Sequence, residues 1–594
     1  MSSEKESAPN APTPPAPPPP PSDPPRRDWR FWAIFPPLCV ATLLSALEST
    51  VVSTALPSIV DDLHSGNLLP VYPPFSYTLR AAAGHLILNK SLTHTNSTAF
   101  QPLYGQLAQV FGRRWLLIGA VAIFALGSGI SGGASSSAML LVGRVIQGAG
   151  GGGISLMTQL VISDLVSVRE RGKFMAIIFT TFSLGTSLGP FIGGALVDNT
   201  TWRWVFYINL PIAGAALVLL YFFLQVHFQR RLTVRQKVSR IDFFGNAILI
   251  ASVTSILIAL SWGGSKYSWR SWHVLVPLLV GFAGTGFFHF YESTRFCKEP
   301  TLPTRILVSN RTTSIVLFCS FCQFLLSFWT IYFLPIYFQG VRLVSPERSG
   351  VLLLPFVITS LPIAMLFGNL LTRWGRYKPI HSVAFMLITL GTGLFIRLDQ
   401  HSSMAEYVIF QIITAVGTGM IMSTLLPAVQ APLQDTQVAP ATATWGFLRA
   451  YGGIWGVAIP GAIFNSQIQT NLAKRVSDPD VRRTLGSGSA YSHVSSSYIR
   501  SLPADIRDDV VSVYVDALRI VWATATAFAG LCFLLTLLEK EVPLRTSVKS
   551  DYGMRRRDQE KKTAGDSNGN AESSQSTSSP DATSTPRPPN PHAS

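Results

Sequence analysis

The stretch from Arg144 to Asp198 reads RVIQGAGGGGISLMTQLVISDLVSVRERGKFMAIIFTTFSLGTSLGPFIGGALVD, and it decides the fold class. Two long apolar segments flank one short hydrophilic turn at residues 167–173. The first segment places a cation and an amide, Arg144 and Gln147, beside a run of glycines that begins at Gly148. Soluble folds have little use for a cation inside an apolar helix. We therefore expect a membrane helix here.

The second segment carries small residues at a regular spacing. Gly185, Gly189 and Gly193 follow one another at four-residue intervals, so they lie on one face of a helix. Small residues at this spacing let helix backbones approach closely inside a bilayer, where packing drives association. Pro190 removes one backbone hydrogen bond beside this face and predicts a kink.

The composition also indicates a membrane protein. Of the 594 residues, 48% are hydrophobic and only 13% are charged, which is about half the charged share of ordinary globular domains. The formal charge of +16 is spread over short loops between apolar runs and over the tails. This distribution is a signal of membrane topology and not of nucleic-acid binding. The cysteines lie mostly inside apolar runs, so we expect them to pack between helices.

Thirteen windows are long and apolar enough to cross a bilayer. They are residues 31–56, 115–133, 136–163, 174–197, 204–224, 243–262, 272–291, 312–337, 347–371, 380–398, 405–428, 439–464 and 514–538. A weaker span must lie between residues 75 and 111, which gives fourteen and places both termini on the same side. Cations concentrate in alternate loops, and this places the termini in the cytoplasm.

Three segments depart from this pattern. Residues 1–28 form a proline-rich tail and residues 541–594 a polar one, and we expect both tails to be disordered and cytoplasmic. Residues 66–98 combine prolines with basic and histidine residues, which makes a poor membrane helix. This segment is either an imperfect second helix or sequence foreign to the fold. Asn199 begins an Asn-Thr-Thr glycosylation sequon on the outer side.

Six short motifs follow one another in order between residues 47 and 245. They are LESTVVSTALP (Leu47–Pro57), GQLAQVFGRR (Gly105–Arg114), RVIQGAGGG (Arg144–Gly152), GTSLGPFIGG (Gly185–Gly194), WRWVFYINLPIAG (Trp202–Gly214) and RIDFFG (Arg240–Gly245). Together they resemble the motifs of the major facilitator superfamily, in its branch of fourteen-helix drug:proton antiporters. The order and spacing of all six make the resemblance specific, and it covers residues 30–540.

This resemblance implies an all-α polytopic membrane protein with the major facilitator fold, built from two six-helix bundles plus two additional helices. On this basis residues 29–225 are the N-terminal six-helix bundle, and residues 226–300 are a linker with two inserted helices. Residues 301–540 are the C-terminal six-helix bundle, with a long outside loop at 468–509. Such proteins work by alternating access around a site near the membrane midplane.

Glu48 and Arg144 are the candidate proton-coupling residues. Glu48 is the only acid in the first span, and a carboxylate in a low dielectric can load and release a proton in each transport cycle. It stands where the branch usually has an aspartate, and the resemblance implicates Arg144 in proton transfer. The alternatives are a structural hydrogen bond for Glu48 and a guanidinium that reaches outward to the membrane surface for Arg144.

The remaining motifs are conformational candidates. Gly105 and Gly112 permit a tight turn, and Arg113 and Arg114 belong to a gating motif or serve only as topology anchors. Gln109 stands where the family usually has an aspartate, which predicts a weaker gating latch. A second copy, GNLLTRWGRYK at residues 368–378, suggests an internal repeat. The resemblance adds to the conformational motifs Gln147, Gly148, Gly185, Gly189, Pro190, Gly193 and Gly194.

Arg449 in the thirteenth span is a candidate for the substrate cavity, together with Trp329 and Tyr332 in the ninth. Packing in the core or at the membrane interface is the alternative for the aromatic residues. Asp516 and Arg519 are three residues apart and are expected to pair on a helix surface.

Other chemistry has little support in the sequence. His273, His289 and His381 lie near span ends without obvious partners. There is no phosphate-binding GxxxxGK[ST] loop and no Cys/His set with metal spacing outside the apolar helices. We therefore expect no enzyme, no metal and no cofactor, and the proton gradient as the source of energy.

The resemblance implies proton-coupled export of amphipathic organic compounds, such as drugs, toxins or secondary metabolites. Siderophores or basic amino acids are the alternative cargo, and a transport-inactive membrane sensor is the alternative from another class. The expected partners are a small-molecule substrate, protons and the lipid bilayer, and not nucleic acid. We expect a monomer in the plasma membrane, with the vacuolar membrane as the alternative.

Overall fold

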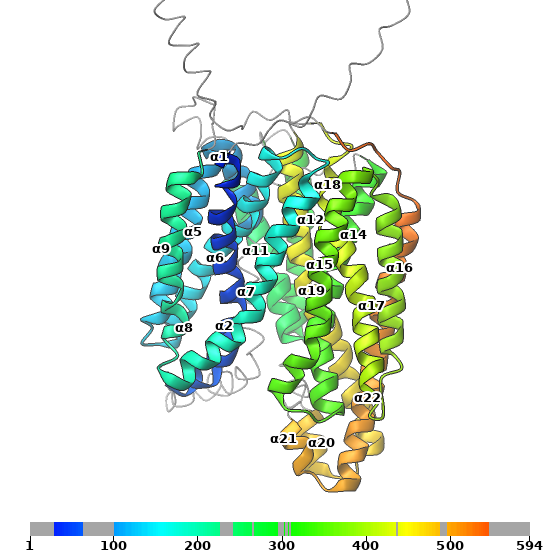
Figure 1. Cartoon of the computed structure of the whole chain (residues 1–594). Coiled ribbons are helices and arrows are strands. Elements are labelled where there is room, and N and C mark those ends of the chain that lie inside the picture. Colours follow the sequence, from blue (N-terminus) through cyan, green and yellow to red (C-terminus); the bar gives the residue numbers. More distant parts are fainter. Residues whose placement is uncertain are drawn as a thin grey trace, which may run out of the picture.

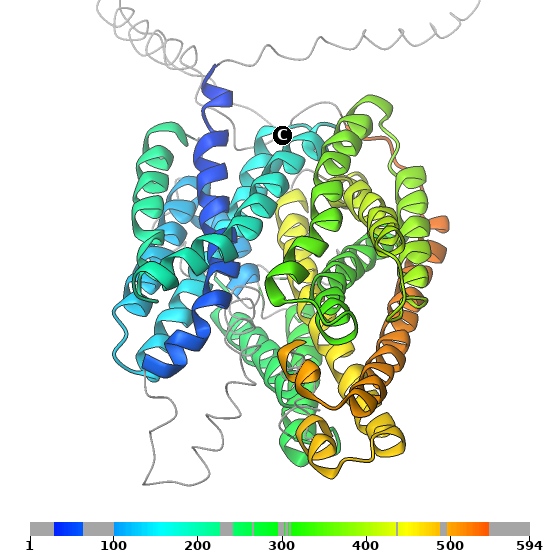
Figure 2. The same ribbon diagram turned by 60° about the horizontal axis from the view of Figure 1, so that its bottom comes forward.

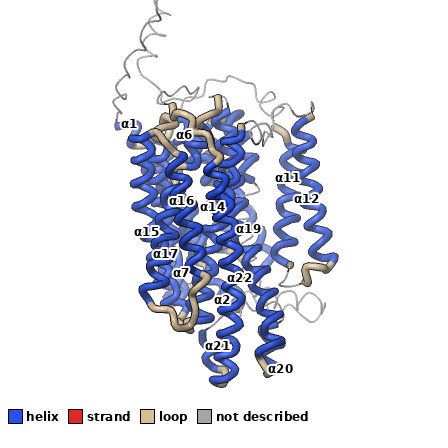
Figure 3. The backbone as a smooth tube through the Cα atoms, turned by 90° about the vertical axis from the view of Figure 1, so that its right-hand side faces the viewer, coloured by secondary structure: helices blue, strands red, loops and turns tan. Residues whose placement is uncertain are grey.

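The computed structural model describes residues 29–62, 100–225, 241–263, 267–294, 310–434, 437–486 and 496–545, together with residues 297, 302 and 307. These residues form helices and connecting loops, and no strand occurs among them (Figure 3). Thirteen of the described helices are long and apolar enough to cross a membrane. This confirms the thirteen predicted windows, and the chain is an integral multi-pass membrane protein with an all-α fold.

The first half of the structure, residues 29–225, is a bundle of long helices. Its helical segments are α1 (Trp29–Trp32), α2 (Phe35–Asp62), residues 100–111, α5 (Arg113–Gly132), α6 (Ser137–Leu165), α7 (Arg171–Asn199), α8 (Trp204–Tyr207) and α9 (Asn209–Phe223). In this bundle α2 packs on α7 and α9, while α5 packs on α6 (Figure 1).

The second half, residues 310–545, forms another bundle, and Figure 2 shows the two halves as separate groups of helices. Its helices are α14 (Arg311–Ile336), the π-helix η1 (Tyr337–Val341), α15 (Pro346–Trp374), α16 (Lys378–Phe395), α17 (Met404–Met422), α18 (Leu425–Gln430), α19 (Val438–Arg475), α20 (Pro479–Gly486), α21 (Ser496–Ser501) and α22 (Ala504–Leu537).

Two further helices, α11 (Phe243–Trp262) and α12 (Trp272–Ser293), stand beside the bundles (Figure 3). They pack mainly on each other and contact the second half through Phe447 of α19. Their position in the chain is that of the two predicted inserted helices. The predicted domain boundaries at residues 225 and 300 adjoin segments outside the described residues, and they stay predictions.

The chain crosses from one end of the bundle to the other between Asp62 and Arg113. Asp62 accepts a hydrogen bond from Trp202 Nε1 at 2.8 Å beside α8, whereas Arg113 begins α5 at the opposite end (Figure 1). This crossing, added to the thirteen helices, gives the expected number of about fourteen. Residues 100–111 are helical and cover about 18 Å of a hydrocarbon core of about 30 Å. The atypical segment 66–98 lies outside the described residues.

The predicted loop at 468–509 is only partly a loop. The helix α19 continues to Arg475, the short helices α20 and α21 follow, and α22 already begins at Ala504. Hydropathy windows report only the part of a helix that fits an apolar bilayer. At 38 residues, α19 is about 57 Å long and therefore extends beyond it. Residues 487–495 lie outside the described part.

Candidate functional site

Glu48 and Arg144 form a buried ion pair inside the first half. Glu48 lies in the middle of α2, and Arg144 lies about two turns into α6. Glu48 is 2% exposed and Arg144 is 4% exposed. Arg144 Nη1 donates to Glu48 Oε1 and, at 2.8 Å, to Gln147 Oε1. Its guanidinium also lies over the ring of Phe206, with Cζ 5.6 Å from the centroid. Arg144 therefore points into the bundle and does not reach outward.

Neutral polar side chains complete the surroundings of this pair. Asn209 at the start of α9 donates through Nδ2 to Glu48 Oε2 and, at 3.0 Å, to Ser128 Oγ. Gln147 Nε2 also donates to Ser128 Oγ at 3.0 Å. The Ser128 hydroxyl in turn donates to the carbonyl of Phe206 at 2.9 Å. All these polar side chains are fully buried.

Sequence reasoning missed Asn209 and Ser128. Asn209 is the one amide in the apolar part of the WRWVFYINLPIAG motif, and this was a usable signal. Ser128 gives no such signal, because serines are common in membrane helices.

The network links the charge of one carboxylate to the positions of four helices, α2, α5, α6 and α9. Protonation of Glu48 would neutralise one partner of a buried pair and leave the other, Arg144, as an uncompensated buried charge. Such a state is costly, so the pair would have to rearrange. A change in the charge of Glu48 would therefore disturb the packing of these four helices.

The glycines of α7 press against α2, the helix that carries Glu48. A Cβ atom built on Gly185 would lie 2.8 Å from Ala46 Cβ, and one on Gly189 would lie 1.9 Å from Thr50 Oγ1. The predicted close approach of helices is thus present at these two positions. A Cβ on Gly194 would meet nothing within 4 Å. The buried Gly148 and Gly193 lie in α6 and α7, and α7 runs as one helix across Pro190, where the kink stays a prediction.

The turn before α5 requires its glycine. Gly112 has a φ of +84°, a conformation that other residues rarely adopt. Arg113, which follows, is buried and pairs with Asp164 of α6 at 2.8 Å. Arg113 therefore has a carboxylate partner although Gln109 replaces the expected aspartate. Arg114 donates through Nη2 to the carbonyl of Tyr221 at 2.5 Å.

The second copy of this motif also places a glycine with a positive φ at its turn. Gly375 ends α15 with a φ of +68°, and it stands seven residues after Gly368, just as Gly112 stands seven after Gly105. The first glycine of each copy touches the opposite half. A Cβ on Gly105 would lie 2.5 Å from Ala443 Cβ, and one on Gly368 would lie 2.7 Å from the carbonyl oxygen of Gly172. The two halves thus meet through equivalent positions of a repeat.

Several hydrogen bonds join the two halves at one end of the molecule, which we call the basic end and define by the turns at residues 112–114, 166–171 and 373–378. Arg169 Nε donates to the carbonyl of Thr372 at 2.7 Å, at the end of α15. Arg171 Nη1 donates to Gln430 Oε1 of α18 at 2.6 Å. The two halves are therefore in contact at this end in the described structure.

Arg449 of α19 lies among aromatic rings that come from both halves. Its Cζ atom is 3.9 Å from the ring centroid of Phe324 in α14, 4.1 Å from that of Phe179 in α7 and 5.0 Å from that of Trp445. Arg449 is 4% exposed, and its Nε atom has no hydrogen-bond partner within the described structure.

The two aromatic residues predicted beside Arg449 lie elsewhere on α14. Trp329 is buried and faces Phe528 of α22, with ring centroids 6.3 Å apart. Tyr332 stacks on Phe328 at 6.0 Å, in a row of rings that leads toward Phe324. A role of Trp329 and Tyr332 in substrate binding stays a prediction.

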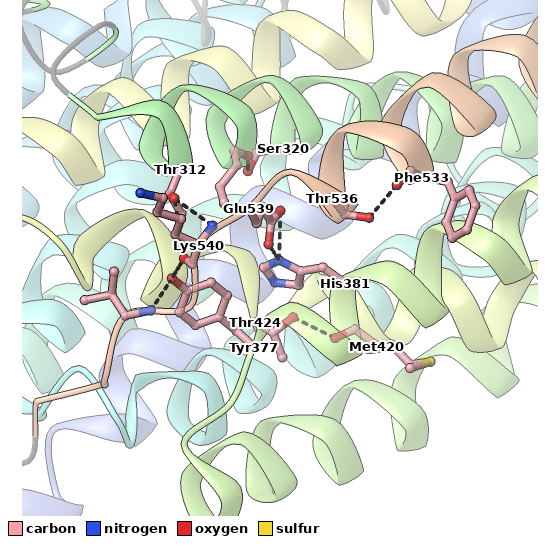
Figure 4. A network of polar contacts seen from close by, with 12 residues as sticks. Thr312, Ser320, Tyr377, His381, Met420, Thr424, Phe533, Thr536, Glu539 and Lys540 are labelled. Carbon is pink, nitrogen blue, oxygen red and sulfur yellow. Dashed lines mark hydrogen bonds and ion pairs between the residues drawn. The ribbon is translucent and has the colours of Figure 1, made fainter.

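The second half also contains a buried acid–base pair, so the expectation that His381 has no partner is wrong. His381 Nδ1 lies 3.1 Å from Glu539 Oε2, and both residues are buried (Figure 4). Glu539 belongs to the segment 538–545, which follows α22 at the basic end. The partner was not evident in the sequence because the two residues are 158 positions apart.

The same segment is held by Tyr377, between α15 and α16. The Tyr377 hydroxyl donates to the carbonyl of Lys540 at 2.8 Å and accepts from the amide of Val542 at 2.9 Å (Figure 4). Burial raises the pKa of Tyr377 to about 12, so the hydroxyl remains a donor at neutral pH. At the end of segment 538–545, the backbone carbonyl of Arg545 accepts a hydrogen bond from the amide of Arg169 at 3.2 Å. Segment 538–545 thus connects the second half to the first.

The other predicted positions are on the surface. Asp516 pairs with Arg519 at 3.4 Å, as expected, and with Arg475 at 2.7 Å. Asn199 is the exposed last residue of α7, where its glycosylation stays a prediction. Among the described residues, no group of three His, Cys, Asp or Glu side chains is placed to hold a metal ion.

Comparisons with known proteins agree on one family. The sequence model of the Major Facilitator Superfamily matches residues 38–457. The chain is 46% identical to the MFS-type transporter TwmF of Talaromyces wortmannii, over 89% of this chain and 93% of that protein. It is 44% identical to the MFS-type efflux transporter ffsH of Aspergillus flavipes, over 88% of this chain and 87% of that protein.

A solved structure has the same fold. The crystal structure of the human organic anion transporter MFSD10 matches with a TM-score of 0.53, over 86% of this chain and all of that chain. The sequence identity is 15%, so this likeness bears on the fold alone.

Proposed function

This chain belongs to the major facilitator superfamily of membrane transporters, and on this premise we propose that it exports amphipathic organic compounds in exchange for protons. The family and its relatives make the chain a transporter of small molecules. The proposal adds the direction, the coupling ion and the class of cargo. The efflux transporter among its relatives supports the direction.

The observation that carries the proton coupling is the buried pair of Glu48 and Arg144. An ionisable pair inside a membrane bundle is costly and is usually retained for function. Glu48 is the acid of this network, and its carboxylate accepts from both Arg144 and Asn209. In the proposed cycle, protonation of Glu48 weakens its ion pair with Arg144 and lets α2 shift.

A chain of direct contacts connects this event to the interface between the halves. The helix α2 packs on Gly185 and Gly189 of α7. The other end of α7 carries Gly172, which lies against Gly368 of α15 in the second half. A shift of α2 would therefore be passed to the contact that closes the basic end. We take the plasma membrane as the site of export and the monomer as the transporting unit.

The test is efflux of a fluorescent amphipathic dye from cells that express the chain, with and without a protonophore, beside Glu48→Gln. We expect the protonophore to abolish efflux, and the Glu48→Gln variant to retain no more efflux than protonophore-treated cells. Asp516→Asn removes an acid from a surface pair and should leave efflux unchanged.

Two results would contradict the proposal. Efflux that is insensitive to the protonophore would exclude proton coupling. Protonophore-sensitive efflux that persists in Glu48→Gln would place the proton site on another residue.

A further inference from the structure

The guanidinium of Arg449 is a buried cation without a counter-ion in the described structure. The residue is 4% exposed, and within the described part no acid forms an ion pair with it and its Nε donates to nothing. Burial of an ionised group is costly unless the charge is paired. Cation–π interactions with Phe324 and Phe179 compensate part of this cost, because Cζ of Arg449 lies 3.9 Å and 4.1 Å from the two ring centroids. The N–H donors of Arg449 still have no acceptor of opposite charge.

The aromatic residues around Arg449 belong to both halves of the transporter. Phe179 lies on α7 of the first half, whereas Phe324 and Trp445 lie on α14 and α19 of the second. A movement of the halves against each other would therefore separate Phe179 from Phe324 and uncover the cation between them. A site with this property opens and closes with the transport cycle.

Unpaired hydrogen-bond acceptors lie one helical turn away. A Cβ atom built on Gly446 would lie 3.3 Å from Gln159 Oε1 and 3.7 Å from Gln101 Oε1, so both amide oxygens of the first half face this glycine. Both oxygens are buried without a donor in the described structure. Gly446 and Arg449 are three residues apart on α19 and share one face. Missing partners on both sides are typical of a site that is completed by a ligand.

We propose that Arg449 binds the carboxylate of an organic acid, whose flat unsaturated body lies between Phe179, Phe324 and Trp445. The amide oxygens of Gln101 and Gln159 accept from a hydroxyl or N–H group on the same molecule. Arginine suits this role because its planar fork matches the two oxygens of a carboxylate. The proposal rests on the proposed export function and narrows its cargo to amphipathic anions.

The test is ligand binding by the purified full chain in detergent, followed as the shift of its thermal unfolding midpoint. The probes are aromatic acids and their uncharged counterparts, namely pyrenebutanoic acid beside pyrenebutanol and naphthaleneacetic acid beside naphthaleneethanol. We expect the acids to stabilise the wild-type chain and the alcohols to do so far less, because only the carboxylates pair with Arg449. Arg449→Gln should weaken binding of the acids by at least about tenfold.

Two further variants make the test specific. Arg449→Lys keeps the charge without the planar fork and should bind the acids with intermediate affinity. Arg519→Gln removes an arginine from a surface pair and should bind them like the wild type. If Arg449→Gln does not fold, the comparison of acids with alcohols on the wild type and the Arg449→Lys result decide the question.

The inference is overturned if no acid stabilises the wild type, if the alcohols stabilise it equally, or if Arg449→Gln binds the acids unchanged. Binding needs no proton gradient, so its outcome is separate from that of dye efflux. If the wild type shows proton-driven efflux but no acid-specific binding, only the proposed anion site is contradicted. If the wild type shows acid-specific binding but no proton-driven efflux, the proposed proton coupling is contradicted and the anion site is supported.

Discussion

At the scale of single residues, Gly189 marks a position where α7 and α2 are in very close contact. Substitution of Gly189→Ala would place a methyl group 1.9 Å from Thr50 Oγ1 and 3.0 Å from the carbonyl of Leu47. We expect this variant to lose about 1–3 kcal/mol of stability, because α2 and α7 would have to move apart. Gly194→Ala is the matched control on the same helix, since its methyl group would meet nothing within 4 Å. Thermal unfolding of both purified variants checks this, and equal midpoints would contradict the close packing.

The sequence indicates the charged members of the site and not their neutral partners. Glu48 and Arg144 stand out because a charge inside an apolar helix is rare. Asn209, which completes the coordination of Glu48, is a neutral side chain whose partner lies 161 positions earlier. Asp164 is charged, but its pairing with Arg113 also joins residues far apart in the chain, 51 positions from each other. Contacts between residues so far apart in the sequence depend on how the helices pack, and hydropathy does not predict this packing.

At the scale of elements, segment 538–545 depends on one hydroxyl group. Tyr377→Phe keeps the buried ring but leaves the amide of Val542 and the carbonyl of Lys540 without their partner. We expect a local loss of about 1–2 kcal/mol and hydrogen exchange at Val542 that is about five- to thirtyfold faster. Tyr221→Phe changes an exposed tyrosine and should leave this exchange rate unchanged. Undiminished protection in Tyr377→Phe would show that other contacts hold the segment.

Membrane helices are the elements that a sequence predicts best, because about 20 apolar residues in a row leave few alternatives. The thirteen clear windows are confirmed for this reason. The extension of α19 to Arg475 was missed because its last turns carry polar residues such as Gln469 and Asn471, outside any apolar window.

At the scale of the whole molecule, the contact between Gly172 and Gly368 closes the basic end. Gly368→Leu would force its side chain into the carbonyl of Gly172, so we expect the halves to separate there. The reporter is a cysteine introduced by Ser163→Cys, at a buried position whose hydroxyl accepts from Gln430 of the other half at 3.3 Å. Maleimide labelling at this position, measured by mass spectrometry in opened membranes, should be severalfold faster with Gly368→Leu.

The control for this experiment lies on the same helix. Gly350→Leu adds the same side chain at the far end of α15, where a Cβ atom would meet nothing within 4 Å. Its labelling rate should match that of the parent. Equal rates for Gly368→Leu and Gly350→Leu would mean that the glycine contact does not control access at the basic end.

The contact of Gly105 with Ala443 has a mechanical consequence. It leaves no room for an added atom, and it lies seven residues, or about 10 Å, from Gly112 at the basic end. Of a membrane about 30 Å thick, about 20 Å then remains on the other side. If the two halves rotate about this contact, the two ends of the molecule move by unequal amounts, because they lie at unequal distances from it. A rotation that opens the basic end by about 2 Å would displace the far end by about 4 Å. One small movement could thus close a narrow gate and open a wide one.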